Sequence, residues 1–335
     1  MSVAAGPPAP GAERQPLPRV IASCDYCAST DATPETGWLR DEEGQHSLPP
    51  PFRTERFQFV RCNGCGLVYL RERPNTADLD IYYGQDYKCF RSYGDRGAIM
   101  KKLASELARR KLREILELMP AGNHTLLDYG CGSGTWLSLL REAGAPPSLR
   151  MVGTDVTEVA IDTARASGLE AYVCDELSLA EHLGPASVGV IHNFHVIEHV
   201  PSPKRMLERL RETLVPGGVL IGQTPNIASY GRRVWGDLWN QWHAPRHFVL
   251  FDHKTLARHA EAAGLEVVSI SNSMSGATQW AQSALSWLAH RGNRPFRGID
   301  EPLYSPLLLA FLPVVAVESA IGRTCHMDFV LRRPR

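Results

Sequence analysis

From residue 124 onward, segments with the pattern of buried strands alternate with segments of helical periodicity. Strand patterns occur at 124–130, 150–156, 169–175, 187–193, 217–226, 265–272 and 325–333. Helical patterns fall between them at 135–144, 158–168, 203–214 and 252–264. Strands that alternate with helices form a mostly parallel sheet covered on both faces. The sequence therefore predicts an α/β fold for this part of the chain.

The first strand runs directly into a glycine-rich turn. The segment LLDYGCGSGTWL places three glycines in alternation: Gly130, Gly132 and Gly134. A dinucleotide-binding turn has the spacing G-x-G-x-x-G, and its third glycine falls here on Thr135, so that class of ligand fits poorly. Glycines at a strand end let a ligand approach the backbone closely. Asp128, just before them, disfavours a phosphate and suits a cationic ligand.

Acidic residues also end the next two strands. Asp155 follows the second strand and Asp175 the third, so both lie at the carboxyl edge, where open parallel sheets bind ligands. A carboxylate at Asp155 can accept hydrogen bonds from both ribose hydroxyls, and Asp175 can accept one from an adenine amino group. Aspartate is also a common turn residue at strand ends, but the two together, in this order, favour a nucleoside ligand.

Five segments resemble, in order and spacing, motifs of the class I S-adenosylmethionine-dependent methyltransferases: LLDYGCGSG, VGTDVT, VCD, GVIHNFHVIEHVPSP and RETLVPGGVLIGQTPN. The resemblance covers roughly 120–335 and looks closest to a bacterial branch that carries HVxEHVxxP after the fourth strand. It implies a Rossmann-like sheet of seven strands, the last of them antiparallel, and S-adenosylmethionine (SAM) as cofactor. That branch often has an N-terminal CxxC…CxxC module and methylates small molecules, glycans or lipids.

The same resemblance implies a role for each cofactor-binding residue. It assigns Asp128 and the three glycines of the turn to the methionyl end of SAM, Asp155 to the ribose and Asp175 to the adenine. Asn193 and the residues after it would line the pocket near the sulfonium.

The resemblance also implies that the segment HNFHVIEHV lies beside the transferable methyl group, in a short helix that the following prolines end. The residues of interest there are His195, Glu198 and His199. Three interpretations stay open. Glu198 and His199 are scaffolding that orients this turn; or His195 is a general base for a hydroxyl nucleophile, since its pKa lies near the operating pH; or all three bind a divalent metal that holds the acceptor.

Residues 226–251, after the fifth strand, are predicted to form a lid over the acceptor site. Its His243 and His247 are alternative candidates for the catalytic base, and Arg246 would hold a carboxylate or phosphate of the acceptor in a bidentate contact. Aromatic side chains offer stacking surfaces for rings, including sugars. The alternative is that the lid tryptophans are buried against the helical insertion: Trp235, Trp239 and Trp242.

Two CxxC pairs stand in segment 21–73, which is too poor in apolar residues to form a core of its own. Two such turns complete a tetrahedral zinc site, so the spacing predicts a closed, structural, zinc-ribbon-like module with these ligands: Cys24, Cys27, Cys62 and Cys65. The 34 residues between the pairs exceed the usual ribbon length, and a redox role is the alternative. The other cysteines are expected to be buried: Cys89, Cys131, Cys174 and Cys325.

Composition predicts the remaining boundaries. Residues 1–20 are rich in Pro and Ala and read as a disordered tail, 74–120 as a linker with an N-terminal helix, and 121–335 as the SAM-binding domain with a helical insertion at 276–321. The apolar run at 307–317 is shorter than the ~20 residues of a membrane span. We expect a buried helix there, with peripheral membrane contact as the alternative. Without a signal-peptide pattern, a cytoplasmic protein is expected.

The balance of charged residues argues against a nucleic-acid-binding function. Lys and Arg total 36, as do Asp and Glu, whereas a nucleic-acid-binding protein usually carries a basic excess. We therefore expect a methyltransferase of a small-molecule acceptor, with a hydroxyl of a glycan, lipid or natural product as the favoured target, and no nucleic-acid partner. Two alternatives stay open: carbon methylation of a nucleotide sugar, and methylation of a nucleic acid or protein with the cysteine module as reader.

Overall fold

The computed structural model describes residues 18–41, 52–75, 79, 81–83, 98–292, 294 and 296–335. Its largest element is a seven-stranded sheet, in the spatial order β12 (Glu266–Ser273), β13 (His326–Arg332), β10 (Leu214–Pro225), β9 (Val188–Phe194), β6 (Thr125–Tyr129), β7 (Arg150–Asp155) and β8 (Glu170–Val173). The five strands from β10 to β8 in this order pair in parallel, and β13 runs antiparallel to both of its neighbours. The predicted α/β fold, with its last strand antiparallel, is confirmed.

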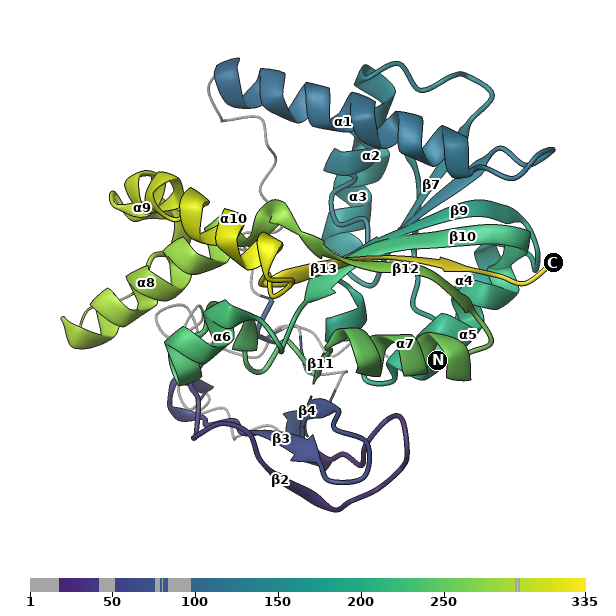
Figure 1. Cartoon of the computed structure of the whole chain (residues 1–335). Coiled ribbons are helices and arrows are strands. Elements are labelled where there is room, and N and C mark those ends of the chain that lie inside the picture. The colour runs from purple at the N-terminus through teal and green to yellow at the C-terminus, as the bar shows by residue number, and fades with distance from the viewer. Residues whose placement is uncertain are drawn as a thin grey trace, which may run out of the picture.

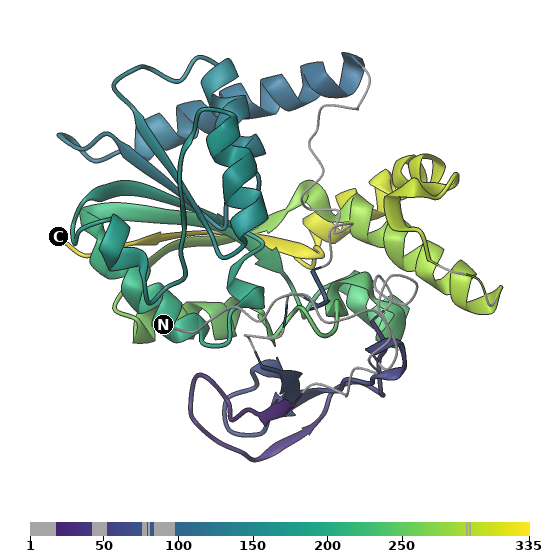
Figure 2. The ribbon, with the colours of Figure 1, turned by 180° about the vertical axis from the view of Figure 1, so that it is seen from behind.

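Helices cover both faces of this sheet (Figures 1 and 2). One face carries α1 (Ala98–Leu118), α2 (Thr135–Glu142) and α3 (Glu158–Ala166). The other carries α4 (Leu179–His182), α5 (Pro203–Thr213) and α7 (His253–Ala262). Because the central strands are buried on both sides, β9 and β10 read as nearly continuous apolar sequence.

Local sequence signals fix where the helices on this second face begin. Ser202 accepts a hydrogen bond from the backbone N–H of Arg205, and a proline opens α5. At α7, Asp252 and Thr255 form a reciprocal capping box. These caps satisfy backbone N–H groups that have no partner inside the helix.

The N-terminal CxxC pairs lie in a small β module, below the large sheet in Figure 1. Its four-stranded sheet has the order β11 (Val249–Leu250), β4 (Val68–Leu70), β3 (Phe59–Cys62) and β2 (Ala32–Pro34). A second, two-stranded pair joins β1 (Arg19–Ile21) to β5 (Glu72–Pro74). The strand β1 thus begins inside the segment 1–20 that was predicted to be disordered, of which residues 1–17 lie outside the described part of the chain.

The module shares its core with the large sheet. The lid supplies β11, which pairs with β4, and the backbone N–H of Leu70 donates to the carbonyl of Phe248 at 2.8 Å. Phe59 packs against Trp242, with ring centroids 5.1 Å apart, inside the same apolar cluster as Leu207 of α5. One continuous apolar core therefore stabilises both parts of the protein.

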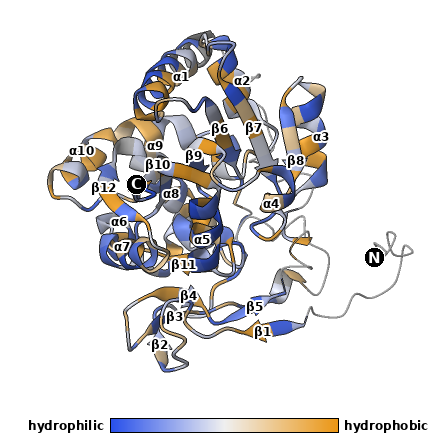
Figure 3. Cartoon of the chain, turned by 90° about the vertical axis from the view of Figure 1, so that its right-hand side faces the viewer, coloured by the Kyte–Doolittle hydropathy of each residue, from blue (hydrophilic) through white to orange (hydrophobic). Residues whose placement is uncertain are grey.

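The predicted helical insertion folds into three main helices: α8 (Ala277–Arg291), α9 (Tyr304–Ala310) and α10 (Leu312–Ala320). The expectation that 307–317 forms a buried helix is wrong, because Leu309 is 66% exposed and Val317 is 61% exposed. Only part of the run, including Val315, packs toward α8, and apolar colour remains on the outside of α9 and α10 in Figure 3. No helix in the described residues combines the length and apolarity needed to cross a bilayer.

Candidate functional site

The glycine-rich turn joins the carboxyl end of β6 to α2. Gly130, Gly132 and Gly134 have φ angles of +80°, +53° and +72°, a region that glycine adopts without strain. A methyl group on Gly130 would meet Cγ2 of Val196 at 2.3 Å, and one on Gly134 would meet Cδ1 of Leu169 at 2.4 Å. Beside Gly132 no described atom lies within 4 Å of that position. The turn therefore leaves an open cradle at its centre, packed tightly on either side.

Asp155, at the end of β7, holds this turn in place. Its carboxylate accepts hydrogen bonds from the backbone N–H of Gly132 and of Thr157, each at 2.9 Å. Burial raises the pKa of this carboxyl above its ordinary value, and the two N–H donors offset only part of that effect. A carboxylate has about four acceptor sites, so Asp155 can still accept hydrogen bonds from a ligand in the cradle.

Asp128 forms a buried pair with His192, a residue of the HNFHVIEHV segment to which the sequence assigned no role. Nδ1 of His192 donates to Oδ1 of Asp128 at 2.7 Å. The imidazole stacks on Trp136 and on Phe194, with ring centroids 5.4 and 4.1 Å away. The signal was available in the strand order, because β6 and β9 are neighbours and their register places Asp128 opposite His192.

Asp175 and Asn193 differ in how many hydrogen bonds their side chains make within the protein. Oδ1 of Asp175 accepts hydrogen bonds from the backbone of Leu177 and Ser178 and from the Ser178 hydroxyl, each at 2.9 Å. This is the turn-forming role, and these three hydrogen bonds all use Oδ1 and not Oδ2. Asn193 is fully buried, and neither its amide nitrogen nor its oxygen has a hydrogen-bond partner among the described residues. Such a group is rare unless something else binds it.

His195 sits just past β9 with a left-handed φ of +56°. Its Nδ1 donates to Oε1 of Glu198 at 3.1 Å, and its Nε2 lies 2.9 Å from Oε1 of Gln223. The amide nitrogen of Gln223 donates to Ser273 and Asp328, which turns the amide oxygen toward His195. Burial lowers the pKa of His195, but the Glu198 carboxylate outweighs burial, so the pKa is raised overall. The His195 side chain is 40% exposed.

Glu198 is the buried anchor of this turn, η5 (Ile197–His199). It is fully buried, and its second oxygen accepts a hydrogen bond from the Thr224 hydroxyl at 2.9 Å. Burial raises the pKa of Glu198, but the hydrogen bond and charge of His195 outweigh it, so the pKa is lowered and the group is ionised. The structure does not bring His195, Glu198 and His199 together as a set of metal ligands.

The two lid histidines instead lie with His199. One ring nitrogen from each of His199, His243 and His247 falls within 4.8 Å of the others. Burial lowers the pKa of His199 to about 4, and burial with two histidine neighbours lowers the pKa of His247 well below its ordinary value. The lid histidines are therefore grouped with His199, whereas the ring of His195 contacts Glu198, Gln223 and His326.

The other lid residues are engaged inside the protein. Arg246 makes a bidentate contact with Asp41 at 2.9 and 3.0 Å, and both side chains are only 3% exposed. The prediction that Arg246 holds the acceptor is therefore wrong. Trp239 and Trp242 are buried, and Trp235 packs on Trp280 of α8, with ring centroids 5.7 Å apart. Packing against the helical insertion is confirmed for Trp235, which is half-buried, whereas Trp242 packs on Phe59 of the N-terminal module.

The four cysteines of the CxxC pairs converge. Sγ of Cys24 lies 3.4 Å from Sγ of Cys65, Sγ of Cys27 lies 3.5 Å from Sγ of Cys62, and all four sulfurs fall within 4.8 Å of one another. None of them is in a disulfide. Tetrahedral zinc with Zn–S bonds of about 2.3 Å separates its sulfurs by roughly 3.8 Å, so the cluster fits that ion. Three of the remaining cysteines are buried as expected: Cys131, Cys174 and Cys325. The fourth, Cys89, lies outside the described residues.

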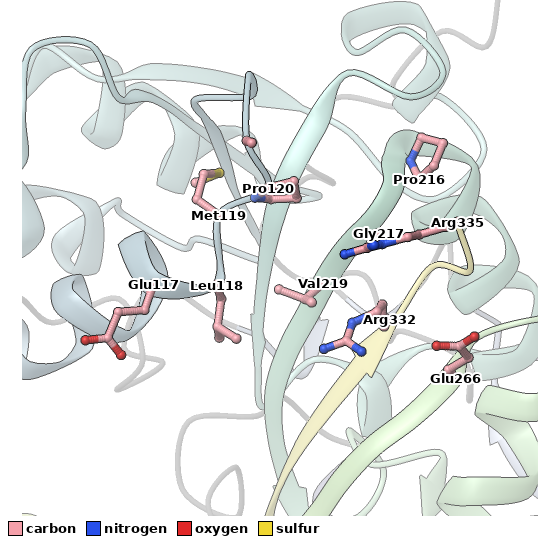
Figure 4. Close-up of a pocket in the computed structure, with 11 residues that line it drawn as sticks. Glu117, Leu118, Met119, Pro120, Pro216, Gly217, Val219, Glu266, Arg332 and Arg335 are labelled. Carbon is pink, nitrogen blue, oxygen red and sulfur yellow. The ribbon is translucent and has the colours of Figure 1, made fainter.

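A pocket of about 790 Å³ lies at the opposite, amino edge of the sheet (Figure 4). Val219 of β10, Glu266 of β12 and the C-terminal Arg332 and Arg335 are among the described residues that line it. No predicted site residue is among them. The site chemistry is therefore at the other edge, around the glycine turn.

Known proteins are similar to this chain in sequence. The family described as "Methyltransferase domain" matches residues 100–270. A ubiquinone biosynthesis O-methyltransferase of Idiomarina loihiensis is 30% identical over 168 residues, which cover 44% of this chain and 67% of that protein. A tRNA (carboxymethyluridine(34)-5-O)-methyltransferase of Macaca fascicularis is 33% identical over 109 residues, 31% of this chain but only 15% of that protein.

Among solved structures, a SAM-dependent methyltransferase from Archaeoglobus fulgidus superposes with a TM-score of 0.44 at 16% identity, over 68% of this chain and 94% of that one. The family match spans half of the chain, and it includes the glycine turn, Asp155 and the His195 turn. The chain therefore belongs to the methyltransferase domain family, within the class I SAM-dependent methyltransferases.

Proposed function

We propose that this protein transfers the methyl group of SAM to a hydroxyl group of a small-molecule acceptor. The observation that carries the proposal is the contact between the glycine turn and the His195 turn. Val196 packs so closely on Gly130 that an added methyl group would meet it at 2.3 Å. His195, the preceding residue, follows the end of β9 at the same edge of the sheet, and its side chain is 40% exposed.

The residues around the cradle fit SAM, which supplies a methyl group activated on a sulfonium. The Asp155 carboxylate suits the ribose hydroxyls, and Oδ2 of Asp175 suits the adenine amino group. Asp128, held by His192, provides negative charge for the ammonium of the methionyl end. The buried amide of Asn193 would gain the partners that it lacks among the described residues.

His195 is proposed to accept the proton of the acceptor hydroxyl. Glu198 binds Nδ1, which orients the ring and stabilises the imidazolium that forms. To act as a base, Nε2 must exchange its contact with Gln223 for one with the acceptor. The turn then holds the hydroxyl in line with the methyl group, and the surrounding protein excludes water.

The relatives support oxygen as the target atom. The Idiomarina protein is named as an O-methyltransferase, and an even balance of 36 basic and 36 acidic residues suits a small acceptor better than a polyanion. We further infer that Cys24, Cys27, Cys62 and Cys65 hold a structural zinc ion, because four thiolates close the coordination shell.

The test begins with SAM binding by the purified protein, measured by calorimetry. Turnover is then measured with labelled SAM across a panel of hydroxylated acceptors, for the natural protein, His195→Asn and the exposed control His290→Asn. His195→Asn should keep its SAM affinity and lose turnover by about 100-fold or more, the contribution of a general base. Absence of SAM binding would overturn the methyltransferase proposal, and full turnover by His195→Asn would overturn the base.

A further inference from the structure

We propose that His199, His243 and His247 bind a divalent transition metal of the zinc class, which ties the lid to the turn that carries His195. This metal centre is separate from the cysteine cluster and does not depend on the methyl-transfer proposal.

The three rings are arranged as metal ligands usually are. Their ligand nitrogens lie within 4.8 Å of one another, and the rings of His199 and His247 are 4.6 Å apart between centroids. Each pair of rings is close to perpendicular, at 78°, 84° and 87°, so the rings meet by their edges without stacking. Zinc with Zn–N bonds of about 2.0–2.1 Å separates its nitrogens by roughly 3.4 Å, so the rings need only a small further approach.

The outer hydrogen bonds point to the same use. Nδ1 of His247 donates to the carbonyl of Gln241 at 2.8 Å. Nδ1 of His199 donates to the carbonyl of Arg246 at 3.1 Å and lies 3.0 Å from the Tyr83 hydroxyl oxygen, which can accept from the same N–H. A metal-binding histidine almost always donates its other ring N–H to such an acceptor, which fixes the tautomer and the ring orientation. Here both bonds leave Nε2 unprotonated as the ligand atom.

The lid backbone is folded to present two of the ligands together. His243 has φ +41° and ψ +42°, the left-handed conformation, and its carbonyl accepts hydrogen bonds from the backbone N–H of Arg246 and His247 at 2.8 and 3.2 Å. The buried contact between Arg246 and Asp41 then fixes this turn against the N-terminal module. Two histidines four residues apart thus lie beside the third, which comes from η5.

The donor set indicates the class of metal. Three imidazoles without a carboxylate suit zinc and its first-row neighbours, whereas magnesium and calcium prefer oxygen ligands. Three protein ligands leave a fourth position for water or another oxygen donor, as in many catalytic zinc sites. The buried carboxylate of Glu198, adjacent in sequence to His199, supplies negative charge near the ion.

The experiment uses the full chain, stripped of metal and titrated with Co²⁺, whose absorption spectrum reports its ligands. The natural protein should bind two equivalents, one with the intense thiolate charge-transfer band of the cysteine cluster and one without it. His243→Asn, chosen because asparagine tolerates the left-handed conformation, should bind the second ion more than about 100-fold more weakly. His290→Asn should match the natural protein, and Cys62→Ser should lose only the thiolate band.

Circular dichroism and SAM affinity should be unchanged in His243→Asn, which separates a lost ligand from a lost fold. If the natural protein binds only the thiolate-liganded ion, or if His243→Asn retains both equivalents, the metal site is overturned. Hydrogen exchange at 239–248 should slow when the second equivalent binds to the natural protein and stay unchanged in His243→Asn. Equal exchange with and without the metal would overturn its role in tying down the lid.

Discussion

Two carboxylate–imidazole pairs lie at the carboxyl edge of β6 and β9. The two pairs differ in how far the imidazole is exposed to solvent. In the first, Asp128 and His192 are both buried, and the imidazole is stacked between two aromatic rings. In the second, Glu198 is fully buried, but His195 is 40% exposed. Only the second imidazole is accessible, so we propose it as the base and propose the first pair for the cofactor end of the site.

Glu198 should set the pH at which His195 becomes active. The base must be neutral, so turnover should rise with pH through a His195 pKa that lies above the ordinary 6.5. In Glu198→Gln the raising group is gone and burial lowers the pKa, so the acid limb of the kcat profile should move to lower pH. Identical acid limbs in the two proteins would show that His195 is not the titrating base.

Asp155 should control SAM affinity in a pH-dependent way. Hydrogen bonds to a charged group contribute roughly 1.5–3 kcal/mol each, so Asp155→Ala should weaken binding by about 100-fold or more. Because burial raises the pKa of this carboxyl, affinity should fall on acidification at a higher pH than an ordinary aspartate would give. Calorimetry over a pH series tests this, and a natural protein whose affinity is flat across that range would contradict the ribose assignment.

Among the elements, the turn between β6 and α2 has the largest influence on the position of His195, because it packs directly on the His195 turn.

The apolar patterns located the strands well: β9 was expected at 187–193 and spans 188–194. The strand β10 begins three residues before the expected 217, since Leu214 pairs with Val188 ahead of a register shift. Periodicity reports burial, so it finds strands reliably but not the pairing irregularities at their ends.

The lid shows where sequence reasoning ends. Its histidines, tryptophans and arginine were all recognised as chemically able, but a pattern does not reveal which partner a side chain finds. Arg246 is bound by Asp41, which is 205 residues away along the chain, and His243 and His247 converge on His199. Local sequence carries no signal for such long-range pairing, whereas Asp128 and His192 follow directly from the order of the strands.

Gly130→Ala should disturb both turns, and Gly144→Ala is the matched control. Both glycines have positive φ, +80° and +97°, so both substitutions carry a backbone strain of roughly 1–2 kcal/mol. Only the alanine at 130 would also overlap Val196, at a further cost of roughly 1–3 kcal/mol. Urea unfolding and turnover should both show the larger loss at 130. Equal losses in the two variants would show that the Val196 turn moves aside for the added methyl group, so that the overlap costs nothing.

At the scale of the whole molecule, the cysteine module is joined to the catalytic part by several kinds of contact. Asp25, inside the first CxxC pair, accepts hydrogen bonds from the Ser202 hydroxyl at 2.6 Å and from the backbone N–H of Lys204 at 3.0 Å, at the start of α5. Arg258 of α7 donates to the carbonyl of Cys65 at 3.1 Å. The turn that holds Cys24 and Cys27 therefore caps α5 of the catalytic part.

Loss of the cysteine-bound metal should destabilise the entire protein. Because one apolar cluster spans both parts, calorimetry should show a single unfolding transition, and chelation or Cys62→Ser should lower its midpoint as a whole. Asn63→Ala, at an exposed residue between the second pair of cysteines, removes only two exposed hydrogen bonds, with Asp31 and Thr33, and should lower the midpoint much less than Cys62→Ser. Two separate transitions, with only the smaller one responding to chelation, would show that the parts unfold independently.

The strand that the lid contributes to the module, β11, limits how this enzyme can be rebuilt. A shortened chain that begins at residue 75 would lack β4, leaving the Val249–Leu250 edge and the indole of Trp242 facing water. Exposed edges and aromatic surface of this kind promote aggregation, so we expect this shortened chain to aggregate. A chimaera with another methyltransferase would have to transplant 18–75 together with the lid, as a single graft.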